Sequence, residues 1–176
     1  WIEGVRAVAG EENPWRVLLS PQGKSLDESM IRELAGKGRI LLLCGRYEGI
    51  DERVRMSVVD EEISIGDYVL SGGEVPAMVL VEALSRQIPG GVGRQESVER
   101  DSFRSGLLDY PHYTRPRVVE DMEVPEVLLS GDHRAIEIWR QRQALEATWN
   151  KRPDLIERAV LTEEQMKLLA ELEKSC

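Results

Sequence analysis

EISIGDYVLSGGE, residues 62–74, is the stretch that decides the fold predicted from this sequence. It begins as a strand-like run, breaks into a glycine-bearing loop and restarts as a helix. The loop combines glycines, which let the main chain approach a ligand closely, with apolar side chains: Gly66, Gly72, Gly73, Ile65, Tyr68 and Leu70. It contains neither a phosphate loop nor the GxGxxG turn of dinucleotide-binding proteins. We therefore expect one wall of a pocket for a small ligand with an aromatic part, and an ordinary strand-to-helix turn is the alternative.

The segments around this stretch alternate between strand and helix patterns. WRVLLS at 15–20 is typical of a strand that ends in a tight loop at 21–23, and Ser25 with Glu28 forms a capping box for a helix to about Ala35. RILLLC at 39–44 is the continuous apolar run of a strand buried on both faces.

Further along, the sequence predicts a short helix to about Met56, extended chain at 57–60 and 62–65, and a helix over 74–88. Alternating strands and helices predict an α/β fold with a mainly parallel sheet. Ligands bind such sheets at the carboxyl ends of the strands. The loops at 20–23, 45–49 and 66–73 all follow strands, so we expect them to converge on one pocket.

The composition changes after Ile88, which suggests a domain boundary. Residues 91–116 are rich in glycine, proline and charge, and we interpret them as a flexible linker. Residues 117–176 look helical, with helices expected at about 132–149, from Pro153, and after a capping box at 162–165. The predicted organisation is a cofactor-binding domain at 1–90, the linker, and a small helical domain at 117–176.

Composition limits the class of protein. The 176 residues are 41% hydrophobic and 31% charged, and no apolar run of 18 residues or signal-peptide core occurs, so a cytoplasmic globular protein is expected. Cys44 and Cys176 suggest neither a disulfide framework nor a zinc site. Trp1 begins what reads as mid-protein sequence, and we expect a fragment.

Net charge argues against nonspecific nucleic-acid binding, because the chain carries a formal charge of −9. Several arginines could nevertheless form a local basic face: Arg86, Arg94, Arg100, Arg104, Arg115, Arg117, Arg140 and Arg142. Asp101 could act as a general base, although a lone aspartate is usually a solvated turn residue. Arg86 could stabilise charge on a substrate oxygen, or simply complement a helix dipole.

Several long motifs occur together and in order: LSPQG at 19–23, LCGRYEGIDERV at 43–54, EISIGDYVLSGGE at 62–74, DSF at 101–103, GLLDYPHYTRP at 106–116, VLLSGDH at 127–133 and WRQRQALEATW at 139–149. Through them the chain resembles the bacterial tRNA (guanine-N1)-methyltransferases (TrmD), of the SPOUT class of knotted methyltransferases. The resemblance covers essentially the whole chain, apart from an N-terminal segment that the family has and this sequence lacks.

The resemblance implies an α/β sheet with a deep C-terminal trefoil knot, one of the rare exceptions to unknotted topology. It implies S-adenosylmethionine bound by the knotted loops, at Leu19, Ser20, Pro21, Gln22, Gly45, Tyr47, Glu48, Ser64, Ile65, Gly66, Asp67, Tyr68, Val69, Leu70, Gly72, Gly73 and Pro76. The methyl group would pass to N1 of the guanine 3′ of the anticodon in tRNA. Asp101 matches the family's general base and Arg86 the arginine that stabilises charge on guanine O6.

Family members are homodimers with the active site at the subunit interface, so the resemblance also implies a second copy as partner. The helical domain would hold tRNA through arginines such as Arg115, Arg140 and Arg142, and no protein-bound metal site is expected, although Mg²⁺ could assist the reaction. Two alternatives stay open: a noncatalytic cofactor- or tRNA-binding fragment, and a SPOUT enzyme that methylates a ribose 2′-hydroxyl.

Overall fold

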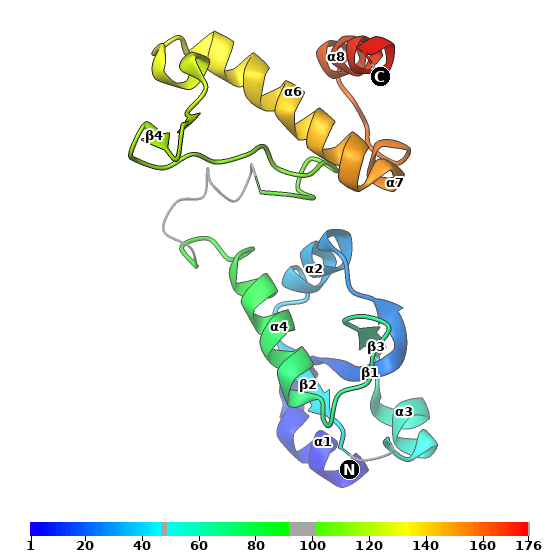
Figure 1. The fold of residues 1–176 in the computed structure, drawn as a ribbon. Coiled ribbons are helices and arrows are strands. Elements are labelled where there is room, and N and C mark those ends of the chain that lie inside the picture. Colours follow the sequence, from blue (N-terminus) through cyan, green and yellow to red (C-terminus); the bar gives the residue numbers. More distant parts are fainter. Residues whose placement is uncertain (47–48, 92–100, 176) are drawn as a thin grey trace. The chain divides into compact units, whose positions relative to one another are not determined.

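The computed structural model describes residues 1–46, 49–91 and 101–175 (Figure 1). It divides into two compact units, residues 1–95 and 96–176. The first unit contains helix α1 (Ile2–Ala9), a 3₁₀ turn η1 (Gly10–Glu12), strand β1 (Trp15–Ser25), α2 (Glu28–Ala35), β2 (Ile40–Cys44), α3 (Glu52–Val58), β3 (Glu61–Ser64) and α4 (Glu74–Ser85).

A three-stranded parallel sheet with the order β2-β1-β3 lies at the centre of the first unit. Successive side chains of β1 point to opposite faces, as the two-residue period of a strand requires. Leu18 packs with α1, α3 and Leu43 on one face, and Val17 and Leu19 pack with α2, α4 and Ile63 on the other. The expected α/β fold with a parallel sheet is confirmed.

Strand β1 differs from the prediction at its end. We expected it to stop at Ser20, but its pairing with β3 resumes after an irregularity, and the strand ends at Ser25. Leu19 and Lys24 both have Ile63 as their partner, so the intervening residues leave the ladder and return to it. The predicted loop at 20–23 therefore exists as an excursion within a strand.

The start of α2 was also predicted wrongly. The capping residue is Asp27, whose carboxylate accepts a hydrogen bond from the amide of Met30 at 2.9 Å, and Ser25 belongs to β1. The predicted end at Ala35 is correct. Aspartate caps a helix as well as serine does, so Ser25 and Asp27 were both possible caps. Asp27 is the cap in the structure because Ser25 is paired in β1.

Two further expectations for the first unit need correction, and one helix was not predicted. Helix α3 runs to Val58, two residues beyond its predicted end, so residues 57 and 58 are helical rather than extended. Strand β2 has apolar neighbours on both faces, but only Leu43 is fully buried, because β2 has one strand neighbour in this sheet. Helix α1 was not predicted, although Val5 and Ala9 form its buried side.

The described part of the second unit begins at Asp101 with a turn, in which the amide of Phe103 donates to the carbonyl of Leu107 at 2.7 Å. A hairpin follows, with strands β4 (Val118–Val119) and β5 (Met122–Glu123), and then η2 (Glu126–Leu129), α6 (His133–Lys151), α7 (Pro153–Ile156) and α8 (Glu163–Ser175). Helix α8 lies against α6 (Figure 1). The three predicted helices are present; the hairpin was missed.

The capping box predicted for α8 is confirmed. The amide of Thr162 donates to Gln165 Oε1 at 2.9 Å, and the amide of Gln165 donates back to Thr162 Oγ1 at 3.2 Å. Inside the unit, buried Thr148 Oγ1 accepts from the amide of Leu108 at 3.0 Å, which ties the segment before the hairpin to α6.

Within the described part of the chain no helix is both long and apolar enough to cross a bilayer. The same residues contain no group of three or more His, Cys, Asp and Glu side chains arranged to hold a metal ion.

Candidate functional site

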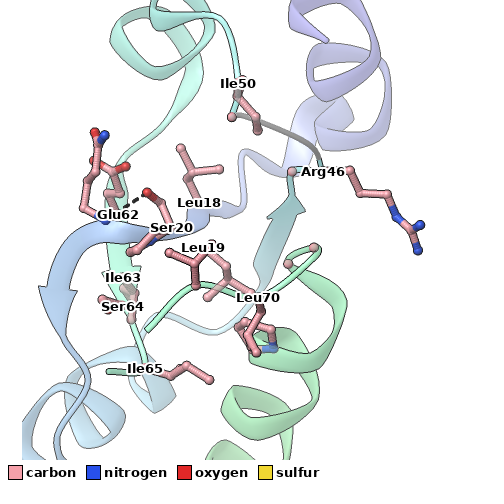
Figure 2. Close-up of a pocket in the computed structure, with 18 of the residues that line it drawn as sticks. Leu18, Leu19, Ser20, Arg46, Ile50, Glu62, Ile63, Ser64, Ile65 and Leu70 are labelled. Atoms are coloured by element: carbon pink, nitrogen blue, oxygen red, sulfur yellow. Dashed lines mark hydrogen bonds between the residues drawn. The ribbon is translucent and has the colours of Figure 1, made fainter. Parts of the chain in front are cut away.

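A cavity of about 440 Å³ lies at the carboxyl ends of the three parallel strands (Figure 2). Three segments line it: residues 18–22 of β1, the chain after β2 from Gly45 into α3, and the chain from β3 to the start of α4. A cavity of this size is large enough for a small organic ligand, for which typical pockets measure about 300–1,000 Å³. The predicted convergence of the three loops is present in the structure.

Most of the residues predicted to bind a ligand line this cavity: Leu19, Ser20, Pro21, Gln22, Gly45, Ser64, Ile65, Gly66, Tyr68, Val69, Leu70, Gly72, Gly73 and Pro76. Asp67 belongs to the same loop and is not among the lining residues. Tyr47 and Glu48 lie outside the described residues. The structure thus brings the set together, and its role in binding a ligand stays a prediction.

Gly73 allows the loop at 66–73 to lie directly on the end of β2. Its amide donates to the carbonyl of Gly45 at 2.9 Å, and the main chains of Arg46 and Gly72 form an isolated antiparallel β-bridge. A Cβ on Gly73 would stand 2.7 Å from Cys44 Cα, so any side chain would push the two segments apart. This contact holds two of the three walls together.

Gly66 is required at the turn that leaves β3. Its φ of +151° is a conformation that other residues rarely adopt, and a Cβ there would stand 2.5 Å from the Tyr68 ring. Ser64 Oγ accepts from the amide of Gly66 at 3.2 Å and is 3.1 Å from its carbonyl oxygen, and Tyr68 Oη donates to the carbonyl of Ile65 at 3.3 Å. These bonds give the wall a defined shape.

Residues 20–22, in the excursion of β1, form the wall of the cavity opposite the loop at 66–73. Ser20 Oγ accepts from the amide of Gln22 at 3.1 Å, the local bond shown dashed in Figure 2. Leu18, Leu19 and Ile63 supply apolar surface beside it, and Leu70 approaches from the opposite loop, whereas the Arg46 side chain points away.

The described residues that line the cavity carry charges of both signs. Arg46 and Arg55 stand against Glu52 and Glu62, and Arg55 is bonded to Glu52. Arg46 Nε also donates to Glu74 Oε1 at 2.8 Å, and this bond lowers the pKa of Glu74 below its usual value. Because Arg46 points away and Arg55 is paired with Glu52, the described lining has no cluster of unpaired cations and is unlike the cationic cradle that a polyphosphate needs.

Sequence reasoning missed eight lining residues: Leu18, Arg46, Gly49, Ile50, Glu52, Arg55, Glu62 and Ile63. Arg46 and Gly49 belong to a loop already identified, and Leu18 and Ile63 could have been found as neighbours of predicted residues. Glu52 and Arg55 lie one turn apart on α3, whose approach to the cavity depends on tertiary packing and leaves no local signal.

The two predicted catalytic residues belong to different units. Arg86 is the C-cap of α4 in the first unit, and its amide bonds to the carbonyl of Leu84. Asp101 is the first residue of the turn in the second unit, and its carbonyl accepts a hydrogen bond from the amide of Arg104 at 3.2 Å. Neither residue lines the cavity described above, and both catalytic roles stay predictions.

Comparison with known proteins identifies the family. The model of the family "tRNA (Guanine-1)-methyltransferase TrmD" matches residues 1–158. The chain is 57% identical over 173 residues to proteins named tRNA (guanine-N(1)-)-methyltransferase from Escherichia fergusonii, Enterobacter sp. strain 638 and Yersinia enterocolitica. These alignments cover 98% of this chain and 68%, 68% and 70% of the respective relatives. The chain belongs to the TrmD family of tRNA (guanine-1)-methyltransferases.

Proposed function

We propose that this chain transfers a methyl group from S-adenosylmethionine to N1 of the guanine 3′ of the anticodon in tRNA. The observation that carries the proposal is the cavity of the first unit, built from the loops that the family resemblance assigns to the methyl donor. The identity of 57% to relatives named for this reaction supports it. A bacterial tRNA substrate would place the reaction in the cytoplasm.

The cavity fits the donor in size and character. Leu19, Ile65 and Leu70 offer apolar surface for an adenine ring. When bound, S-adenosylmethionine supplies a methyl group that is already strongly electrophilic, so the protein's task is alignment and proton removal.

Asp101 is proposed to remove the proton from guanine N1, whose lone pair is then free to attack the methyl carbon. Arg86 is proposed to stabilise the negative charge that this displaces onto O6. A guanidinium suits that role because it stays charged at neutral pH and donates in a defined plane.

A homodimer is the proposed working form, and α4 carries the structural support. Leu80 is its buried residue, while Val75, Met78, Val79 and Val81 are exposed, with Met78 at 71%. Tyr68 and Val69, in the loop before α4, are exposed as well. Helix α4 is therefore apolar on both its covered and its open side, as expected of a helix that a second copy covers.

Membership of the TrmD family is the support for the knot, for the role of the second unit and for Mg²⁺. We propose that the loops at the cavity belong to a trefoil knot, that residues 117–176 act as a helical tRNA-binding domain beyond the linker at 91–116, and that Mg²⁺ could assist from the substrate side. Size-exclusion chromatography with light scattering tests the dimer. Met78→Glu should give monomers, and Val160→Glu, at a residue 95% exposed in the second unit, should not.

The central test measures methyl transfer from labelled S-adenosylmethionine to tRNA with and without the target guanine. Asp101→Asn should lower turnover by about 10²–10⁴-fold, while donor affinity by calorimetry stays unchanged. Asp121→Asn in the hairpin is the matched control, since asparagine tolerates the positive φ of that position. Retained turnover in Asp101→Asn contradicts the assigned base.

Product analysis separates the alternatives. Methyl on N1 of guanine supports the proposal, and methyl on a ribose 2′-oxygen would replace it with the other SPOUT reaction. Donor or tRNA binding without turnover would indicate a noncatalytic chain.

A further inference from the structure

The sequence YPHYTRPR, residues 110–117, lines a second cavity that lies entirely within the second unit. Extended chain is expected here because each proline restricts the residue before it to extended conformations. The segment passes between the hairpin, η2 and α6, and with them encloses about 840 Å³. The cavity is thus as large as a typical small-molecule site, about 300–1,000 Å³, and no residue of it is needed for the methyl-donor cavity.

The charge of this cavity is unlike that of the chain. Arg115, Arg117 and Arg140 line it, and no described lining residue is acidic, although the whole chain carries −9. Arg140 Nε is buried and has no hydrogen-bond partner among the described residues. Arg117 has only a loose, exposed ion pair with Glu123 at 3.7 Å. Three guanidinium groups without carboxylates on the lining indicate an anionic ligand.

Aromatic rings line the same cavity, and one of them lies against the Arg140 guanidinium. The Tyr113 and Trp139 rings are 6.3 Å apart with an interplanar angle of 54°, a tilted contact that leaves no slot between them. Tyr113 lines the cavity and is 47% exposed, so its ring keeps free surface on which a flat group can stack. The Arg140 guanidinium lies 4.9 Å from the Tyr110 ring, which holds its planar group at the cavity wall.

We propose that this cavity binds one unpaired nucleotide of an RNA, with its base stacked on Tyr113 and its phosphates paired with Arg115 and Arg117. The inference rests on the proposed tRNA substrate and adds a binding site that is separate from the reacting guanine. An exposed ring and guanidinium groups that line one cavity match both parts of a nucleotide, whereas a phosphorylated peptide needs the cations alone. The base must be unpaired, because a paired base presents no free face to a side chain.

Stacking and charge make separable predictions for tRNA affinity, measured by fluorescence anisotropy on the full chain over a range of salt concentrations. Tyr113→Ala should weaken binding by about 5- to 150-fold, the equivalent of one lost base stack, with the salt dependence unchanged. Tyr113→Phe should bind as the wild type does, because the ring remains. Arg115→Gln and Arg117→Gln should each reduce the slope of log affinity against log salt by about 0.7.

Arg158→Gln is the matched charge control, since Arg158 is an exposed arginine of the same unit outside the cavity lining. Far-UV circular dichroism of each variant checks that the unit is folded. A uridine hexamer and a duplex of equal length serve as minimal probes, and the single strand should bind more tightly.

The outcomes distinguish this inference from the proposed function. If the wild type methylates tRNA but Tyr113→Ala and the arginine variants bind it unchanged, the nucleotide site is wrong and the methyltransferase remains. If the wild type neither binds nor methylates tRNA, both fail together. Equal loss in Tyr113→Phe and Tyr113→Ala, or preference for a phosphotyrosine peptide over the uridine hexamer, also overturns the site.

Discussion

Replacement of Gly73 by alanine tests the contact that joins two walls of the methyl-donor cavity. The new Cβ would stand 2.7 Å from Cys44 Cα and 3.2 Å from the amide nitrogen of Gly45. Both are backbone atoms, so no flexible side chain can move aside. Carbon atoms pack at about 3.5–4.0 Å, and the two segments would therefore have to separate by close to 1 Å.

The expected cost follows from three contributions. Overpacking of this kind costs about 1–3 kcal/mol. Stretching the bond from the Gly73 amide to the Gly45 carbonyl removes up to about 0.5–1.5 kcal/mol. Against these, Gly73 has an ordinary helical φ of −80°, so alanine regains about 0.4–1 kcal/mol by restricting the unfolded chain. The net loss of unfolding free energy is about 0.5–4 kcal/mol, with a central value of about 2 kcal/mol.

Urea denaturation of the full chain measures this loss, and calorimetry with S-adenosylmethionine measures the effect on the cavity. With a slope of about 1–3 kcal/mol per molar urea, the midpoint should fall by roughly 1 M, and donor affinity should fall with it. Gly4→Ala on α1 is the matched control, because its Cβ would meet nothing within 4 Å, and it should raise stability by about 0.5–1 kcal/mol. An unchanged midpoint and donor affinity in Gly73→Ala would refute the reasoning.

Three further features of the structure give clear expectations: the cap of α2, the turn at Gly66 and the capping box of α8. Asp27→Ala should cost about 0.5–2 kcal/mol of unfolding free energy, measured in urea, by removing the cap of α2. The Met30 amide and then the Ser29 hydroxyl lower the pKa of Asp27 below 3.8, so the advantage of wild type over Asp27→Asn should persist above that value and disappear as the pH falls through the lowered pKa. Gly66→Ala should cost about 1–3 kcal/mol and weaken donor binding in calorimetry, since its φ of +151° strains any side chain, and equal donor affinity would contradict this. Thr162→Ala should lower the unfolding free energy by about 0.5–2 kcal/mol, measured as a lower urea midpoint. Gln165→Ala should cost less in the Thr162→Ala background than in the wild type, because the two residues form a reciprocal pair of hydrogen bonds.

The sequence was most informative where local pattern and tertiary packing agree. The apolar run RILLLC at 39–44 predicted a strand, and residues 40–44 of it form β2, which has apolar neighbours on both faces. The loops of the cavity were predictable because glycines and strand ends mark them in a single sequence. The capping box at Thr162 needs only neighbouring residues, and it formed as predicted.

The errors arose where distant contacts decide. Pro21 cannot donate to a ladder and so suggested the end of β1, yet Lys24 and Ser25 pair with β3 beyond it. The β4–β5 turn places Glu120 and Asp121 at positive φ, where asparagine and glycine are the usual signal. Roles for Asp101 and Arg86 came from the family resemblance, because no local pattern distinguishes a catalytic aspartate from a solvated one.

The excursion in β1 has a consequence for how this pocket can change over evolution. Leu19 and Lys24 share the partner Ile63, so β1 and β3 pair on both sides of the excursion. Residues 20–23 of the excursion have no partner in β3. Substitutions or short insertions at Ser20, Pro21 or Gln22 can therefore alter what the pocket accepts at little cost to folding. Gly23 is the exception, because any side chain there would collide with the backbone of β3. Ligand preference can vary at three residues while the fold constrains the fourth.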